Sequence, residues 1–391
     1  MAATTTTKPT VIDQGILTPV VRRALDSETA QVTEWQVVSL QGGAGDLGAG
    51  LIGVSRVTGK AKDQGETKPW SLILKVIRAS DSAADPTTAR YWAREPLAYQ
   101  SRMLAELPGG LAAPRCFEVM ETPGEAYWLW LEDITDEGEL QWPLERFGVA
   151  AYHLGYFNGS FLLETIPRQQ LWMSQRWLRA YITESIAPMA AIRAMPDHPL
   201  IRRLYPDDLV ERLLQLWAER EIFLQALERL PQTLCHMDAF RRNLFSRRAL
   251  DGREQTVAID WAFAGMGALG EELVPLVIAS VGFFGIEVDR LRELEEVVFE
   301  RYLAGLRDAG WRGDPRLVRF AYAAASGLRF GLPPGVDPID ANLDPWFEQM
   351  LGRPMEEILH TWVILRRFLF DLADEARDLL GWVETYQISE T

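Results

Sequence analysis

Two short segments of the chain carry side chains suited to phosphoryl transfer. The first contains His236, Asp238 and Asn243, and the second places Asp260 at the end of an apolar run. Transfer of a phosphoryl group to a hydroxyl requires a carboxylate that orients the hydroxyl and accepts its proton. It also requires an amide and a second carboxylate that hold Mg²⁺ on the phosphates. The residue types, order and spacing therefore predict Mg²⁺-dependent phosphoryl transfer.

Each of these side chains has a role that fits its chemistry. Asp238 is the candidate catalytic base, since an exposed carboxylate of ordinary acidity is ionised at neutral pH and can accept the proton of an acceptor hydroxyl. Asn243 and Asp260 are the candidate metal ligands, because Mg²⁺ prefers oxygen atoms. His236 is expected to fix the loop by hydrogen bonding to nearby backbone.

Two arginines, Arg241 and Arg242, lie between Asp238 and Asn243. One of them can neutralise the transferred phosphoryl group, or both can be solvated loop side chains, and the residue types leave both interpretations open. Ordinary loop composition explains any single polar residue of this segment. The joint spacing of the base and the metal-ligand candidates favours a site.

A glycine-rich segment provides the first part of a candidate nucleotide site. Gly43, Gly45 and Gly48 lie between two runs typical of strands. A dinucleotide-binding fold needs this motif between a strand and a helix, so a strand–loop–strand flap over phosphates fits better. A plain hairpin turn is the alternative, because glycine clusters are common in turns.

A lysine in an apolar run provides the second part. Lys75 lies within residues 72–77, where an unpaired buried ammonium would be costly. ATP phosphates would pair it, and Glu95 on the following helix could hold the ammonium in place. A solvated lysine on an edge strand is the alternative. Glu132 closes the β-rich region, where a connector could offer backbone groups to an adenine edge.

Composition limits the class of protein. The chain has 391 residues, 48% of them hydrophobic, which is typical of a globular protein with two or three packed lobes. A net charge of −15 argues against nucleic acid or an anionic membrane as partner, and it fits either a cationic acceptor or simple solubility. Two cysteines and four histidines argue against a disulfide framework and a zinc site. With no apolar signal core and no run long enough for a membrane span, a cytoplasmic protein is expected.

Strand-like patterns dominate the first third of the chain and helical periodicity the rest. Strands are expected at 32–40, 51–57, 70–78, 116–120 and 126–131, with a hairpin loop at 58–68 and one long helix at 85–107. Helices are expected at 143–165, 170–190, 206–230, 270–281, 288–308, 314–330 and 354–382, with a strand at 256–259. This predicts an α+β chain with a tail and short helix (1–30), a nucleotide-binding lobe (31–134) and a helical lobe (135–391).

Together these residues resemble the aminoglycoside phosphotransferase-like family of the protein-kinase-like superfamily. That family carries His-Gly-Asp-x-x-x-x-Asn and then Ile-Asp-Trp, where this chain has His236-Met237-Asp238-x-x-x-x-Asn243 and Ile259-Asp260-Trp261. Residues 264–267 resemble the family's Ala-Gly-x-Gly turn. The resemblance implies Asp238 as base, Asn243 and Asp260 as Mg²⁺ ligands, and Lys75 with Glu95 as the phosphate-binding pair. It also implies two lobes, the smaller with a five-stranded antiparallel sheet and one long helix.

The resemblance fixes the chemistry better than the substrate. Met237 replaces the family's middle glycine and Glu272 stands where a later aspartate is common, but neither change removes the base or a metal ligand. The implied activity is transfer of the γ-phosphoryl group of ATP or GTP, with Mg²⁺, to a hydroxyl of a sugar, amino alcohol or aminoglycoside-type acceptor. An antibiotic phosphotransferase conferring resistance is one alternative. A pseudokinase that binds nucleotide as a scaffold is an alternative of another class.

The acceptor is expected between the loop of Asp238 and the C-terminal helices. Those helices carry aromatic residues, among them Trp346, Phe347 and Trp362. An aromatic-walled pocket could hold a sugar ring or an organic cation. Core packing at helical spacing is the alternative. The acidic loop at 332–345 could meet ammonium groups or be an ordinary solvated loop.

Overall fold

The computed structural model describes residues 12–40, 51–122, 125–138, 141–163, 170, 172–185, 199–249, 251–333 and 344–386. Gly43, Gly45 and Gly48 lie outside these residues, as does most of the acidic loop. The chain folds as two compact units, Met1–Ser80 with Pro114–Ile134 and Asp81–Ala113 with Thr135–Thr391. The segment 81–113, which the sequence assigned to the first lobe, therefore packs with the second unit.

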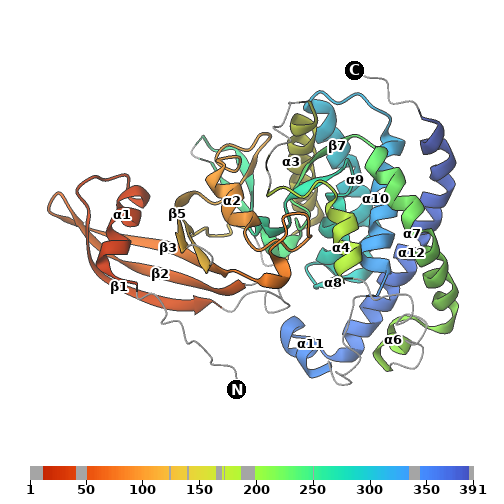
Figure 1. Ribbon diagram of the computed structural model, residues 1–391, viewed down its shortest axis with the longest axis horizontal. Helices are drawn as coiled ribbons and strands as arrows, with labels where there is room; N and C mark the ends of the chain where they lie inside the picture. Colours follow the sequence, from red (N-terminus) through yellow and green to blue (C-terminus); the bar gives the residue numbers. More distant parts are fainter. Residues whose placement is uncertain are drawn as a thin grey trace. The chain divides into compact units, whose positions relative to one another are not determined.

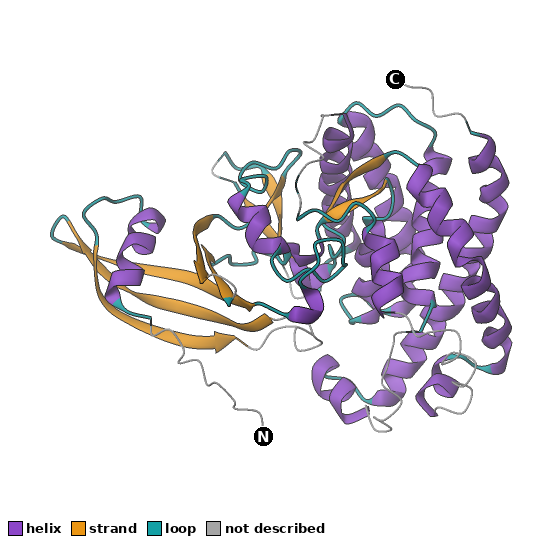
Figure 2. Cartoon of the chain, in the orientation of Figure 1, coloured by secondary structure: helices purple, strands orange, loops and turns teal. Residues whose placement is uncertain are grey.

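The first unit is built on a five-stranded antiparallel sheet (Figure 2). Its strands are β1 (Gln31–Leu40), β2 (Leu51–Asp63), β3 (Glu66–Arg78), β5 (Cys116–Thr122) and β6 (Ala126–Glu132). The order across the sheet is β1-β2-β3-β6-β5, so β3 is the central strand. The expected small antiparallel sheet is confirmed.

The hairpin between β2 and β3 is longer than the sequence indicated. The expected loop at 58–68 is wrong, because Lys60 pairs with Pro69 and Asp63 with Glu66. Only Gln64 and Gly65 form the turn, with φ of 51° and 89°. Two left-handed residues match the right-handed twist of the strands and allow so tight a connection. Polar residues are compatible with the paired strands of an exposed hairpin as well as with a loop. The polar composition of 58–68 therefore did not distinguish the two.

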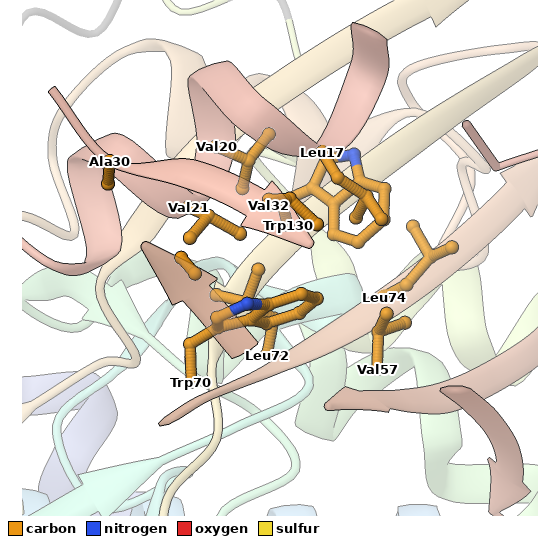
Figure 3. Packing of buried hydrophobic residues seen from close by; sticks show 11 residues of the cluster. Leu17, Val20, Val21, Ala30, Val32, Val57, Trp70, Leu72, Leu74 and Trp130 are labelled. Atoms are coloured by element: carbon orange, nitrogen blue, oxygen red, sulfur yellow. The ribbon is translucent and has the colours of Figure 1, made fainter. Parts of the chain in front are cut away.

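Helix α1 (Gln14–Ala24) covers one face of the sheet. The Asp13 side chain caps its start by accepting the Ile16 N–H at 2.9 Å. The buried cluster between helix and sheet (Figure 3) consists of Leu17, Val20, Val21, Ala30, Val32, Val57, Ala61, Trp70, Leu72, Leu74 and Trp130. Since successive strand residues point to opposite faces, Lys75 lies on the face opposite to Leu74 and this core.

The long helix expected at 85–107 is reduced to α2 (Arg94–Gln100). The buried Arg94 guanidinium donates to the carbonyl oxygens of Thr88 and Ala89, both at 2.6 Å, and of Pro86 at 3.2 Å. These bonds satisfy the three carbonyl groups outside a helix, in a segment that forms turns. The chain also adopts a left-handed conformation at Arg102, with φ of 61°, just beyond the end of the helix.

The second unit is mainly helical (Figure 1). Besides α2, its described helices are α3 (Leu144–Leu163), α4 (Trp177–Ser185), α6 (Pro199–Leu204), α7 (Asp207–Arg229), α8 (Ser280–Gly282), α9 (Leu291–Asp308), α10 (Pro315–Ser326), α11 (Asp344–Leu351) and α12 (Met355–Thr385). The expected helices at 270–281 and 314–330 include π-helical segments, Pro275–Ala279 and Gly327–Gly331. Helices α7, α10 and α12 pack side by side.

Helices α3 and α9 cross in close contact because each carries a glycine at the crossing. A Cβ at Gly155 would overlap with the Tyr302 carbonyl, and one at Gly305 would overlap with the Tyr152 carbonyl. Only glycine permits such an approach of two backbones. None of the helices that the structure describes combines the length and apolarity needed to span a lipid bilayer.

Short strands in the second unit hold the segments with the candidate catalytic residues. Strand β7 (Gln232–Cys235) pairs with β10 (Gly265–Ala268). Strands β4 (Leu111–Ala112), β9 (Glu254–Ala258) and β8 (Leu244–Arg248) form a second small sheet in that order. The sequence predicted only the strand near 256–259. Asp238 and Asn243 thus lie between β7 and β8, and Asp260 follows β9.

Candidate active site

The loop of residues 236–243 connects β7 to β8, and the segment after β9 lies against it. The Ile259 N–H donates to the Asn243 carbonyl oxygen at 2.9 Å. This bond ties the residue before Asp260 to the end of the 236–243 loop. Two segments that are separate in the sequence are thereby joined at the candidate site.

The Asn243 side chain is oriented by Asp238. Its Nδ2 donates to the Asp238 carbonyl oxygen at 3.0 Å and to Asp238 Oδ2 at 2.9 Å. Because the amide nitrogen is engaged with Asp238, the amide oxygen is the atom left to face a cation. The arrangement suits an oxygen ligand for Mg²⁺ next to a carboxylate base.

Asp260 has a left-handed backbone, with φ of 63° and ψ of 67°. A non-glycine residue in this region is uncommon and persists where its surroundings hold it in place. The next residue, Trp261, is fully buried, and its N–H donates to Glu95 Oε1 at 3.3 Å. The turn that presents Asp260 is therefore fixed on the side of Trp261.

His236 makes backbone hydrogen bonds through both ring nitrogens. Its Nδ1 accepts the Asp238 N–H at 3.1 Å, and Nε2 lies 2.9 Å from the Ile259 carbonyl oxygen. This pattern requires the tautomer with the proton on Nε2. The ring also packs edge to face with Trp261, with centroids 4.5 Å apart. The expected contact of His236 with nearby backbone is present.

Met237 occupies a position whose conformation favours glycine. Its φ is 64°, which costs a residue with a side chain about 1–2 kcal/mol. The side chain is buried, with 1% of its surface exposed. The conformation explains why a glycine is common at this point, and burial of the Met237 side chain offsets part of the strain.

Glu272 is a residue whose contact the sequence did not reveal. Its Oε2 accepts the His236 N–H at 2.6 Å, and its Oε1 accepts the Met237 N–H at 3.1 Å. Burial raises the pKa of Glu272 to about 7, although these N–H donors oppose the rise. One indication of this role was present in the sequence, because Glu272 stands where the family that this chain resembles commonly has an aspartate.

Arg329 is the second residue that the sequence did not reveal. It lies in the π-helical segment after α10, more than 80 positions from the 236–243 loop. Its Nη2 donates to Asp238 Oδ1 at 3.2 Å, and its Nη1 donates to the Met237 carbonyl oxygen. No feature of the sequence distinguished this arginine from the others.

The acidity of Asp238 differs from the expected ordinary value. The side chain is 25% exposed. Burial raises the pKa of Asp238 to about 6, Arg329 opposes this rise, and the nearby Asp260 adds to it. The negative charge of Asp260 thus raises the pKa of Asp238, as expected for two carboxylates that lie close together.

The part of the chain that includes these loops is similar to a family of known proteins. Residues 167–313 match the model of the phosphotransferase enzyme family. This region includes the 236–243 loop and Asp260, and the match confirms the expected resemblance. No curated protein matches the chain in sequence.

One solved kinase structure is similar to this chain in fold, and two further kinases are similar at lower TM-scores. An amicoumacin kinase bound to AMP-PNP and Ca²⁺ is 14% identical, with 92% of this chain and 94% of that chain covered and a TM-score of 0.50. A microcompartment-associated aminopropanol kinase is 14% identical, with 94% and 98% covered and a TM-score of 0.48. An ethanolamine kinase from Plasmodium vivax is 12% identical, with 86% and 81% covered and a TM-score of 0.45. The likeness to the amicoumacin kinase confirms the α+β protein-kinase-like fold.

The structure also describes three of the nucleotide-site candidates. Lys75 is 8% exposed on the central strand β3, opposite Val54 and Leu129, so the alternative of a solvated edge-strand lysine is wrong. Glu95 is 1% exposed and lies in the second unit, whereas Lys75 lies in the first. Glu132 ends β6, and its Oε2 accepts the Arg115 N–H at 3.1 Å.

The two arginines of the 236–243 loop differ in their surroundings. Arg241 forms a partly buried ion pair with Asp136 at 2.9 Å and lies over the Trp142 ring. Arg242 is exposed and lies over the Phe283 ring. Arg241 is therefore engaged in packing, and Arg242 has the more solvated position.

Part of the aromatic set near the C-terminus lies at the surface. Trp346 on α11 is 41% exposed, so core packing does not describe it. Phe347 contacts both Trp346 and Trp362 edge to face, at centroid distances of 4.9 and 5.0 Å. These rings form a continuous aromatic strip between α11 and α12.

Proposed function

We propose that this chain is a small-molecule kinase that transfers the γ-phosphoryl group of ATP or GTP to an alcohol hydroxyl, with Mg²⁺. The observation that carries the proposal is the joined pair of loops with Asp238, Asn243 and Asp260. The hydrogen bond from Asn243 to Asp238 and the electrostatic effect of Asp260 on Asp238 support their action as one unit.

The donor set fits Mg²⁺ bound to a nucleotide. The Asn243 amide oxygen and the Asp260 carboxylate are hard oxygen donors, whose preferred partner is Mg²⁺. Within the described part of the chain, no group of three or more His, Cys, Asp or Glu side chains could hold a metal by itself. A nucleotide-bound Mg²⁺ needs only one or two protein ligands, because phosphate oxygens and water complete its shell. When bound, the ion would neutralise charge on the phosphates.

Asp238 is proposed as the base. The acceptor hydroxyl donates its proton to the Asp238 carboxylate while its oxygen forms a bond to the γ-phosphorus and the bond to the ADP oxygen breaks. Asn243 donates to one of the two carboxylate oxygens of Asp238. The proton then leaves Asp238 to solvent.

The remaining nucleotide contacts are proposals of the same kind. We assign Lys75 to the phosphates, since a buried ammonium on a central strand requires negative charge nearby. Glu95 as its partner, a phosphate flap at Gly43, Gly45 and Gly48, and base recognition near Glu132 belong to the same proposal.

The acceptor is proposed as a small molecule with a free hydroxyl, in a cytoplasmic setting. Sugars, amino alcohols and hydroxyl-bearing antibiotics are the classes to test. A host expressing the gene would become resistant if an antibiotic is the substrate. A metabolic kinase would instead restore growth of a strain lacking the corresponding activity.

ADP release by the purified protein tests the proposal. The assay combines MgATP or MgGTP with a panel of aminoglycosides, sugars and amino alcohols. We expect acceptor-dependent ADP release that EDTA abolishes and that Asp238→Asn lowers by about 1,000-fold or more. Asp251→Asn is the matched control, because Asp251 is exposed in the turn between β8 and β9.

Two results would contradict the proposal. One is no nucleotide binding together with no turnover of any acceptor. The other is turnover that persists in the Asp238→Asn variant, which would favour a binding protein or a different base.

A further inference from the structure

We propose that Arg329 is a positioning residue that fixes the Asp238 carboxylate for proton transfer. This inference rests on the proposed function. Nη2 of Arg329 donates to Asp238 Oδ1 at 3.2 Å, while Asn243 Nδ2 donates to Oδ2 at 2.9 Å. One donor on each oxygen fixes the plane of the carboxylate, which Asn243 alone would leave free to rotate about χ2.

The same guanidinium also holds the backbone of the loop. Nη1 of Arg329 donates to the Met237 carbonyl oxygen, one residue before the base. Arginine presents its donors in a rigid planar fork, so the two contacts fix the base relative to its own backbone. The left-handed Met237 is held from the other side by Glu272, which accepts its N–H.

Arg329 is itself held rigidly. Only 5% of its side chain is exposed. The guanidinium carbon lies 4.7 Å from the Trp177 ring centroid, 5.1 Å from that of Phe330 and 5.5 Å from that of Tyr181. Aromatic faces attract a guanidinium, and such an enclosure leaves it little freedom to move. Helix α4 and the segment 327–331 thus support the base through this side chain.

The positive charge of Arg329 lies near several carboxylates. It acts electrostatically on three buried or partly buried carboxylates, Asp238, Glu271 and Glu272. A buried carboxylate is costly without a nearby cation. Removal of Arg329 would therefore affect the loop both by lost hydrogen bonds and by uncompensated negative charge.

Steady-state kinetics of Arg329→Gln and Arg329→Lys test the inference. Turnover is measured with MgATP and the acceptor found by ADP release, and also with water as acceptor, as basal ATP hydrolysis. We expect Arg329→Gln to lower kcat by about 100-fold, since a displacement of about 1 Å has an effect of that size. Lysine keeps the charge but not the fork, so Arg329→Lys should lower kcat less. The Kd for MgATP should stay within twofold in both variants.

Arg319→Met is the matched control. Arg319 also joins helices through ion pairs, at 2.8 Å to Glu295 and 2.6 Å to Glu375, but it does not contact the 236–243 loop. We expect this variant to lose stability and keep kcat. Melting temperatures of all variants establish that each is folded at the assay temperature, and if Arg329→Gln does not fold, Arg329→Lys decides.

The outcomes separate the two proposals. A wild-type protein that neither binds nor turns over nucleotide removes the proposed function and this inference with it. An active wild-type protein whose Arg329 variants retain kcat within twofold removes this inference alone. A parallel loss of kcat, MgATP affinity and melting temperature, as large in Arg319→Met as in Arg329→Gln, would show a merely structural role.

Discussion

The terminal methyl group of Met237 occupies the space beside Gly267, where a Cβ would overlap with it. Met237 replaces a glycine of the first motif, and Gly267 belongs to the later motif that resembles Ala-Gly-x-Gly. The Met237 side chain thus fits because Gly267 has no side chain. The two motifs are coupled by packing as well as by the chemistry they are proposed to share.

This coupling predicts a non-additive pair of substitutions. Gly267→Ala should lower the free energy of unfolding by about 1–3 kcal/mol, because the new methyl group forces Met237 to move. In a Met237→Gly background the same substitution should have an effect smaller by about 1 kcal/mol or more. Urea unfolding of the wild type, both single variants and the double variant measures this. Effects that add within 0.5 kcal/mol would contradict the coupling.

Glu272 is predicted to stabilise the 236–243 loop. Glu272→Ala leaves the buried N–H groups of His236 and Met237 without an acceptor, so the free energy of unfolding should fall by about 3 kcal/mol. Turnover should fall as well, since the loop carries the proposed base. Glu296→Ala, on the exposed face of α9, is the control. Equal stability of the two variants in chemical denaturation would refute this role.

Stability is predicted to depend on pH through Glu271. Burial raises its pKa to about 7 in the folded state, against an unfolded value of 4.5. The folded state therefore binds more protons between these values, and this contribution to stability is present at low pH and lost as pH rises towards 7. Glu271→Gln lacks this titration, so its stability relative to the wild type should increase across that range and then level off. A constant difference from pH 4 to pH 8 would show that Glu271 titrates normally.

Lys75 is predicted to determine nucleotide affinity. Lys75→Met keeps a flexible apolar side chain at this buried position of β3 but removes the ammonium. The Kd for MgATP should rise tenfold or more, as a charge-assisted hydrogen bond contributes about 1.5–3 kcal/mol. Lys60→Met is the control on the same sheet, because Lys60 is 57% exposed and pairs with Glu34. Calorimetric titration with MgATP gives both values, and equal affinity of the two variants would remove Lys75 from the site.

The sequence predicted best what depends on local spacing. Asp238 and Asn243 are five positions apart on one loop, so their encounter follows from the chain itself. The core strands and the longest helices also carry their own periodic pattern. Arg329 reaches Asp238 across 91 positions and Glu272 reaches His236 across 36, and no periodicity or motif encodes such contacts.

The structure also differs from the prediction at segments where hydrogen bonds outweigh the intrinsic helix or strand propensity of the residues. The helix expected at 85–107 gives way to turns because Arg94 engages the carbonyls before it. The polar segment 58–68 pairs as strand because its backbone is satisfied by its neighbours, whatever its side chains. Short strands such as β7 and β10 have four residues each, too few for a pattern to be recognisable.

The left-handed backbone of Asp260 reverses the usual ranking of conservative replacements. Glutamate preserves the charge but tolerates this conformation poorly, whereas asparagine adopts it more readily than most residues and lacks only the charge. The replacement that keeps the charge, Asp260→Glu, would therefore distort the turn. The exchange that removes the negative charge would leave its shape intact.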